Sequence, residues 1–130
     1  RRSLRRATRR QDGQALWVAY LSEATLWAGR PQEALARAQQ ALALARAHKE
    51  RGHEAWTLRL LGDIARQRAP AACEDAATAY RQALSLAQEL GMRPLQAHCH
   101  RGLGALYAEM DQREQASAEL STVWPAVLEA

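Results

Sequence analysis

The sequence contains no phenylalanine and only a few valine, isoleucine and threonine residues. A β-rich fold depends on such β-branched and aromatic residues, so their scarcity argues against one. The chain is instead dominated by Ala, Leu, Arg, Gln and Glu, which are good helix formers. We therefore expect an all-α protein.

Other missing features narrow the class of protein. No run of about 18 apolar residues occurs, so we expect no membrane-spanning segment. No charged-then-apolar pattern of a secretion leader is seen, so we do not expect secretion. The two cysteines have no CxxC spacing, and we expect free thiols in a reducing cytoplasm. The chain has 130 residues and does not begin with Met, and we interpret it as a single domain, residues 1–130, from a longer protein.

Three landmarks recur at intervals of 40 to 42 residues. A leucine followed by a small residue, an alanine after a polar pair, and a pair of apolar residues appear in the same order in each copy. Such internal periodicity is typical of helical repeat proteins. The leucine-small pairs end at Ser22, Gly62 and Gly104, the alanines are Ala34, Ala76 and Ala116, and the apolar pairs begin at Ala41, Ala83 and Val123.

Each copy indicates two amphipathic helices, because apolar residues follow the three-and-four spacing of one helix face, as over residues 55–65. The small landmark residues are expected where two helix axes approach closely. Helix-stopping residues predict breaks inside the hairpins and turns between them, at 29–31, 69–71, 111–112, Gly52 and Gly91, with Pro94 opening the next helix. The repeats then span 13–52, 53–92 and 93–130, the last of them truncated.

The order of Leu-Gly, Tyr107, Ala116 and an Ala-Leu pair resembles the tetratricopeptide repeat. The resemblance implies an α-α superhelix of about three stacked hairpins, with a concave groove lined by the first helix of each hairpin. The period is longer than that family's usual length of about 34 residues. Ser22 also replaces the glycine in the first copy.

A narrower resemblance covers residues 32–122. The stretches Ala45–Trp56, Tyr80–Leu84 and Glu89–His100 are similar to the helical tails of large bacterial signalling proteins. Such tails follow a nucleotide-cyclase domain and an NTPase domain. The resemblance implies the kind of parent protein, and it leaves the role of this segment open.

The basic residues are unevenly distributed. Of 18 basic residues, six are arginines in the first ten positions, which leaves 12 basic against 14 acidic groups in residues 11–130. Register with the later copies favours residues 1–11 as the tail of a helix from an upstream repeat, with the arginines on its solvated face. The alternative is an arm that binds nucleic acid or anionic lipid, because six arginines without an acid could contact several phosphates.

Catalytic and metal-binding patterns are missing from the sequence. The neighbours His98, Cys99 and His100 point about 100° apart on a helix, so they cannot converge on one ion. There is no four-ligand zinc spacing, no Gly-rich phosphate loop and no nucleophile elbow. We expect no catalytic residue, no metal and no cofactor.

The groove remains as the candidate site. In the tetratricopeptide family the second, fifth, ninth and thirteenth places of the first helix face inward. The family's carboxylate clamp needs Asn where Glu23 and Asp63 stand, so we expect no such clamp, although Arg59 and Arg101 match its basic element. The alternative is that these side chains pack against neighbouring repeats or face water. Counted from residues 15, 55 and 97, the candidates are Glu23, Trp27, Trp56, Arg59, Asp63, His98, Arg101 and Glu109.

The sequence thus favours a protein–protein interaction and regulatory scaffold in a larger bacterial cytoplasmic signalling protein. It would bind a partner segment, or another domain of its parent, in the groove. A nucleic-acid-binding arm and a structural or dimerisation spacer are the alternatives. At the C-terminus Pro125 should kink or stop the last helix, and an exposed end containing Val123, Trp124 and Leu128 could form a homodimer.

Overall fold

The computed structural model describes the backbone at residues 2–68, 71–110 and 118–123, and side chains from residue 14 onwards within those ranges. These residues form helices and short turns and contain no strand, which confirms the all-α prediction. A short helical segment covers residues 118–123. The five longer helices are α1 (Arg2–Trp27), α2 (Pro31–Ala47), α3 (Arg51–Gln67), α4 (Cys73–Leu90) and α5 (Arg93–Glu109).

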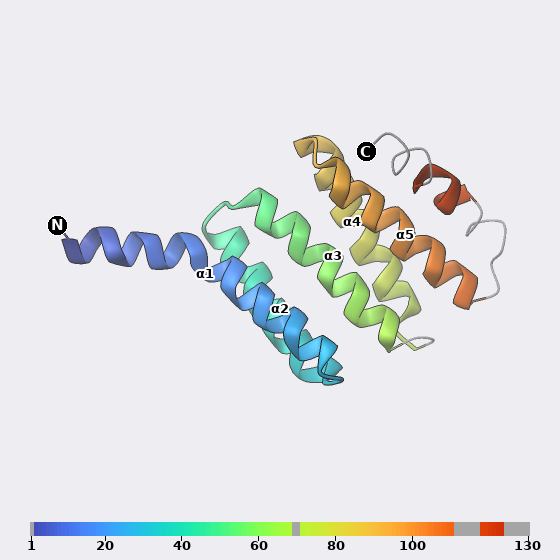
Figure 1. The fold of residues 1–130 in the computed structure, drawn as a ribbon, viewed down its shortest axis with the longest axis horizontal. Helices are drawn as coiled ribbons and strands as arrows, with labels where there is room; N and C mark the ends of the chain where they lie inside the picture. Colours follow the sequence, from blue (N-terminus) through green and yellow to red (C-terminus); the bar gives the residue numbers. More distant parts are fainter. Residues whose placement is uncertain (1, 69–70, 111–117, 124–130) are drawn as a thin grey trace.

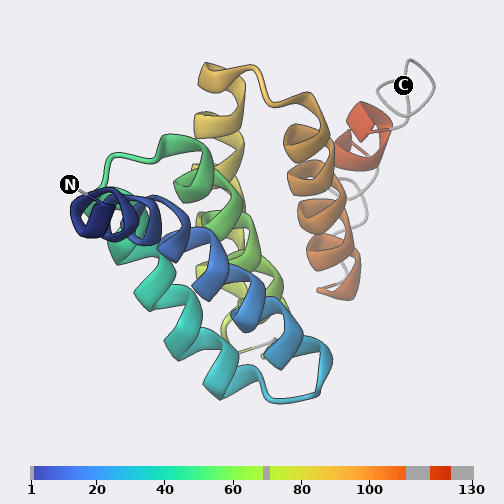
Figure 2. The same ribbon diagram turned by 60° about the vertical axis from the view of Figure 1, so that its left-hand side comes forward.

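The helices are stacked as successive hairpins. α1 pairs with α2 and α3 with α4, and α5 follows in the position of another first helix (Figure 1). The first helices α1, α3 and α5 lie side by side in one layer, and α2 and α4 form the second layer (Figures 1 and 2). This arrangement is the predicted α-α superhelix of tetratricopeptide type.

Two of the predicted breaks are made by glycines in the left-handed backbone region. Gly29, between α1 and α2, has φ +80°, and Gly91, between α4 and α5, has φ +71°. Glycine adopts this region at little cost because it has no Cβ. Pro31 then begins α2 and Pro94 lies in the first turn of α5, where a missing backbone N–H costs no hydrogen bond.

The prediction of a turn at Gly52 is wrong. α3 begins at Arg51, so Gly52 lies inside its first turn, and the chain reverses at residues 48–50. There Lys49 takes the left-handed conformation with φ 55°, and the backbone N–H of Glu50 bonds to the carbonyl of Ala45. The local hydrogen bonds of the helix end therefore determine the turn, at a cost of about 1 kcal/mol for a residue with a side chain.

α1 also differs from the expectation for the N-terminus. We predicted a helix tail over residues 1–11 followed by a new repeat from residue 13, whereas α1 is continuous from Arg2 to Trp27. A lone glycine such as Gly13 costs a helix about 1 kcal/mol relative to Ala, which weakens a helix without ending it. The N-terminal half of α1 projects beyond the stack (Figure 1).

Small residues lie where the helices of a hairpin approach closely, as predicted for Ser22 and Gly62. Ser22 is fully buried, and its Oγ donates a hydrogen bond of 2.6 Å to the backbone carbonyl of Ala34. A Cβ at Gly62 would lie 2.7 Å from the ring of Tyr80, so only glycine fits there. A Cβ at Gly102 of α5 would lie 2.5 Å from the same ring, a close approach that the repeat landmarks do not predict. Tyr80 of α4 therefore joins α3 to α5.

The C-terminal expectations are only partly covered by the structure. Val123 is buried, so the expectation that it forms part of an exposed end is wrong. The landmark register explains this burial, because the equivalent residues Ala41 and Ala83 are also buried. The expected break at 111–112 and the residues Trp124, Pro125 and Leu128 lie outside the described residues.

Candidate functional site

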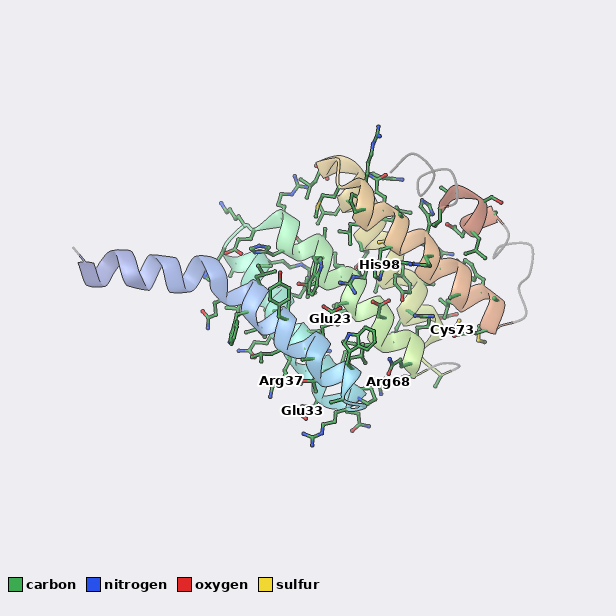
Figure 3. The ribbon with its side chains drawn as sticks, in the orientation of Figure 1. Glu23, Glu33, Arg37, Arg68, Cys73 and His98 are labelled. Carbon is green, nitrogen blue, oxygen red and sulfur yellow. The ribbon has the colours of Figure 1, made fainter. Side chains whose placement is uncertain are left out.

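The three first helices enclose a cleft of about 560 Å³. Glu23 of α1 and His98 of α5 approach α3 from its two sides (Figure 3), so the cleft extends across α1, α3 and α5. Six of the eight predicted groove residues line it, and Trp56 and Glu109 do not. The complete lining is Glu23, Leu26, Trp27, Arg59, Leu60, Asp63, Arg66, Gln67, His98, Arg101, Gly102 and Ala105.

Arg59 is the charge at the centre of the cleft, and it is almost fully buried, with 4% of its surface exposed. Its guanidinium carbon lies 4.6 Å from the ring centroid of Trp56, and its Nη1 donates a hydrogen bond of 2.7 Å to Asp63 Oδ2. The same nitrogen lies 3.9 Å from Glu23 Oε1. Burying a cation is expensive unless it is paired, and here two carboxylates and an aromatic face compensate it. Arg59 therefore ties α1 to α3.

Asp63 collects hydrogen bonds from three helices. Besides Arg59 of its own helix, the hydroxyl of Tyr80 donates to Asp63 Oδ1, and His98 Nε2 lies 3.5 Å from Asp63 Oδ2. Burial acts to raise the pKa of Asp63, but the hydrogen bonds from His98, Tyr80 and Arg59 outweigh burial and leave this pKa below its usual value. Asp63 is accordingly a carboxylate at neutral pH, and it fixes the spacing of α3, α4 and α5.

The rim of the cleft has a different character. Trp27 is 82% exposed, although it is a large aromatic side chain. Arg101 of α5 is exposed, and within the described part of the chain no carboxylate pairs with it. Arg66 Nη1 lies 3.5 Å from Glu109 Oε1. The rim thus offers a ligand an aromatic surface and, at Arg101, a positive charge that no carboxylate of the described residues pairs with.

Trp56 lies beneath the cleft instead of lining it. The ring of Tyr20 meets it edge to face at a centroid distance of 5.5 Å, and Arg59 covers it. Trp56 therefore helps to pack α1 against α3. For Trp56 and Arg59 the structure favours the alternative stated above, packing between repeats.

The neighbours His98, Cys99 and His100 on α5 point in different directions. His98 points toward Asp63, while His100 Nδ1 lies 2.5 Å from Glu119 Oε2 of the next helical segment. Cys99 between them is buried against α4, and this burial raises the pKa of its thiol to about 12. Both cysteines are free thiols. Among the residues that the structure describes, no group of three or more His, Cys, Asp and Glu side chains could hold a metal ion.

Six lining residues are not among the eight candidates. Gln67 and Ala105 stand at the thirteenth and ninth places of the count, whereas four lie outside the counted places, namely Leu26, Leu60, Arg66 and Gly102. They share a simple feature, since each stands at the sixth or twelfth place of its helix in the same count. A helix face about 100° wide includes these places next to the fifth and thirteenth. Counting a face instead of a single line of positions would have found them.

Within the described residues, no helix is both long and apolar enough to cross a membrane. The sequence matches no protein-family model and no curated protein. Among the solved structures that it resembles is the crystal structure of the TPR domain of Arabidopsis FLU, with a TM-score of 0.81 and 15% sequence identity. The match covers 92% of this chain and 99% of that chain. It shows that the fold is that of a tetratricopeptide-repeat domain.

Proposed function

We propose that this chain is a non-catalytic protein-interaction module, which holds a segment of a partner protein, or of another domain of its parent, in the cleft between α1, α3 and α5. The observation that carries the proposal is the rim, where Trp27 and Arg101 are both exposed beside a concave surface. Exposed aromatic and Arg side chains are enriched at protein interfaces. The tetratricopeptide fold supports the same function by analogy.

The charges of the cleft indicate what the bound segment carries. Glu23 and Asp63 are directed at the buried Arg59 and are therefore compensated within the protein. Arg101 is left without a described carboxylate, so the bound segment would supply one. A large apolar side chain of the segment would cover Trp27. The proposed ligand is a peptide segment with an acidic residue beside a large apolar residue.

The wider setting is also a proposal. The resemblance over residues 32–122 supports a place in a larger bacterial signalling protein that works in the cytoplasm. There the module would recognise a partner or a neighbouring domain and regulate the parent protein. A homodimer through the C-terminal end belongs to the same set of proposals.

A peptide selection tests the binding site. Peptides selected from a random library on the native protein are titrated by fluorescence anisotropy against Trp27→Ala and Arg101→Glu. We expect each variant to weaken binding by at least about tenfold, as is usual when a central interface residue is removed. The matched controls are Trp17→Ala, an exposed tryptophan of α1 outside the cleft, and Arg93→Glu, an exposed arginine of α5 outside the cleft. Equal losses in the controls, or no selectable peptide, would refute the proposal.

One observation keeps nucleic-acid binding as a second candidate. The N-terminal half of α1 projects beyond the stack, and its first ten residues include five arginines and no acidic residue (Figure 1). A salt titration of DNA binding, with and without residues 1–10, separates this function from the first. Micromolar affinity at physiological salt that depends on those residues would favour it, with a steep loss of affinity as salt rises.

A further inference from the structure

The cleft contains one side chain whose charge depends on pH in the neutral range. Among the described residues that line the cleft, His98 is the only histidine. Its side chain is 38% exposed, so a bound ligand can reach the ring. Histidine is the side chain type that ordinarily gains or loses its charge between about pH 5 and pH 8. A ligand in the cleft therefore meets a neutral imidazole in weak base and a cation in weak acid.

Asp63 fixes the orientation of this imidazole. His98 Nε2 lies 3.5 Å from Asp63 Oδ2, on the side that faces α3 (Figure 3). Because a carboxylate faces Nε2, the proton of the neutral ring is held on that nitrogen, and Nδ1 is an acceptor. Asp63 does not take up the next proton itself, since its hydrogen bonds keep its pKa below the usual value. Proton uptake by His98 therefore gives Nδ1 an N–H group and gives the ring a positive charge.

The other charged and titratable groups around His98 come from four helices. Carboxylates and guanidinium groups ordinarily keep their charges between about pH 5 and pH 8. The Tyr80 phenol stays neutral there, because burial and the nearby carboxylate raise its pKa. The lining holds three guanidinium groups and two carboxylates, a formal charge of +1, which proton uptake by His98 doubles. These groups are Glu23 of α1, Arg59, Asp63 and Arg66 of α3, Tyr80 of α4 and Arg101 of α5.

His98 and Arg101 are neighbours on one face of α5. They stand three residues apart in the helix, a spacing that places two Cβ atoms about 5–6 Å from each other. Both line the cleft, and within the described residues no carboxylate pairs with Arg101. A single carboxylate of a ligand can therefore lie between the two side chains. It would accept a hydrogen bond from Arg101 at any neutral pH and a second one from a protonated His98.

We propose that His98 is a specificity-determining residue of the cleft, which on protonation binds the acidic residue of the ligand together with Arg101. This inference rests on the proposed function, because it requires a bound acidic segment. The protein would then bind such a segment more tightly at about pH 5.5 than at about pH 7.5. The expected gain is about fivefold, the upper end for a partly exposed ion pair. A segment without the acidic residue would show no such gain, so the preference for acidic segments increases in weak acid.

Fluorescence anisotropy with a labelled, selected peptide tests the inference. Its Kd is measured at the two pH values and at constant ionic strength, because salt screens such charges. The second probe is the same peptide with its acidic residue replaced by the corresponding amide, and its affinity should not depend on pH. His98→Gln should bind the acidic peptide equally at both pH values. His98→Lys is charged at both, so at the higher pH it should bind as tightly as the wild type does at the lower one.

His100→Gln is the matched control, since His100 lies on the same helix but does not line the cleft. It should keep the pH dependence of the wild type, and circular dichroism at both pH values checks that each variant is folded. The inference is overturned if the wild type binds the acidic peptide equally at both pH values, if His98→Gln keeps the gain, or if the amide peptide shares it. In these cases peptide binding itself, and with it the proposed function, still stands. Failure to obtain any binding peptide at either pH would refute both.

Discussion

The contact of Gly102 with Tyr80 allows one substitution to be worked through in detail. A Cβ added at Gly102 would lie 2.5 Å from two ring carbons of Tyr80 and 2.9 Å from its hydroxyl oxygen. The ring has little room to move away, because it is fully buried, it also lies close to the backbone of Gly62, and its hydroxyl is bound to Asp63. Overpacking of this kind costs about 3 kcal/mol at the upper end of the usual range.

Alanine is also the better helix former, and this preference opposes the steric cost by about 1 kcal/mol. The net effect of Gly102→Ala is therefore a loss of about 2 kcal/mol in the free energy of unfolding. For a chain of 130 residues, such a loss lowers the midpoint of thermal unfolding by about 7 °C. Thermal denaturation followed by circular dichroism measures it directly.

Gly52→Ala is the matched control for this experiment. Gly52 also lies in a helix, but a Cβ there would meet nothing within 4 Å. Helix propensity should act alone, and the protein should gain up to about 1 kcal/mol. The two substitutions thus have opposite expected signs. If Gly102→Ala is neutral or stabilising, the close packing of α4 against α5 at Tyr80 is not as described.

Three further predictions follow from particular residues. Asp63→Asn leaves the buried Arg59 short of a carboxylate, so it should cost about 3 kcal/mol at pH 7 in urea unfolding. Because the pKa of Asp63 is lowered in the folded state, the stabilisation by its carboxylate is complete above about pH 4 and is lost as the pH falls through the lowered pKa. Asp63→Asn should therefore remove this part of the loss of stability in acid. An unchanged dependence of stability on pH would contradict the hydrogen bonds described around Asp63. A thiol reagent should label Cys73 quickly in the native protein and Cys99 only on unfolding, since Cys99 is buried and the pKa of its thiol is raised to about 12. Mass spectrometry measures the labelling of each cysteine, and equal rates in the native protein would contradict this prediction. Lys49→Gly should stabilise the protein by up to about 1 kcal/mol, because Lys49 has φ 55°, whereas Lys49→Ala should not.

The stacking of the helices could be predicted from the sequence for a physical reason. Paired amphipathic helices with small residues at a fixed interval can bury their apolar faces only against each other and the next pair, and Ser22 and Gly62 are found at such contacts. Gly91 was also predictable, since a left-handed helix end favours glycine. The position of the turn near Gly52 was not predictable. A glycine allows a left-handed turn but does not require one, and here Lys49 adopts the left-handed conformation instead.

The candidate site was predictable in position but not in chemistry. Helical spacing brought Glu23, Asp63 and His98 to the same cleft, as counted. The sequence could not show that Arg59 would be buried, since its burial depends on Glu23 from another hairpin and on the ring of Trp56 beneath it. A basic residue expected to meet a ligand is instead part of the scaffold, and Arg101 is left as the exposed cation.

The most direct test of the central claim is the indole N–H signal of each tryptophan in a two-dimensional NMR spectrum during titration with a selected peptide. The chain has four tryptophans, so the indole signals report on separate places. The signal of Trp27, at the rim of the cleft, should move progressively to saturation, while that of Trp17, which is exposed on α1 outside the cleft, stays in place. A peptide that shifts Trp17 and leaves Trp27 unchanged would contradict the account, because the partner would then bind outside the cleft.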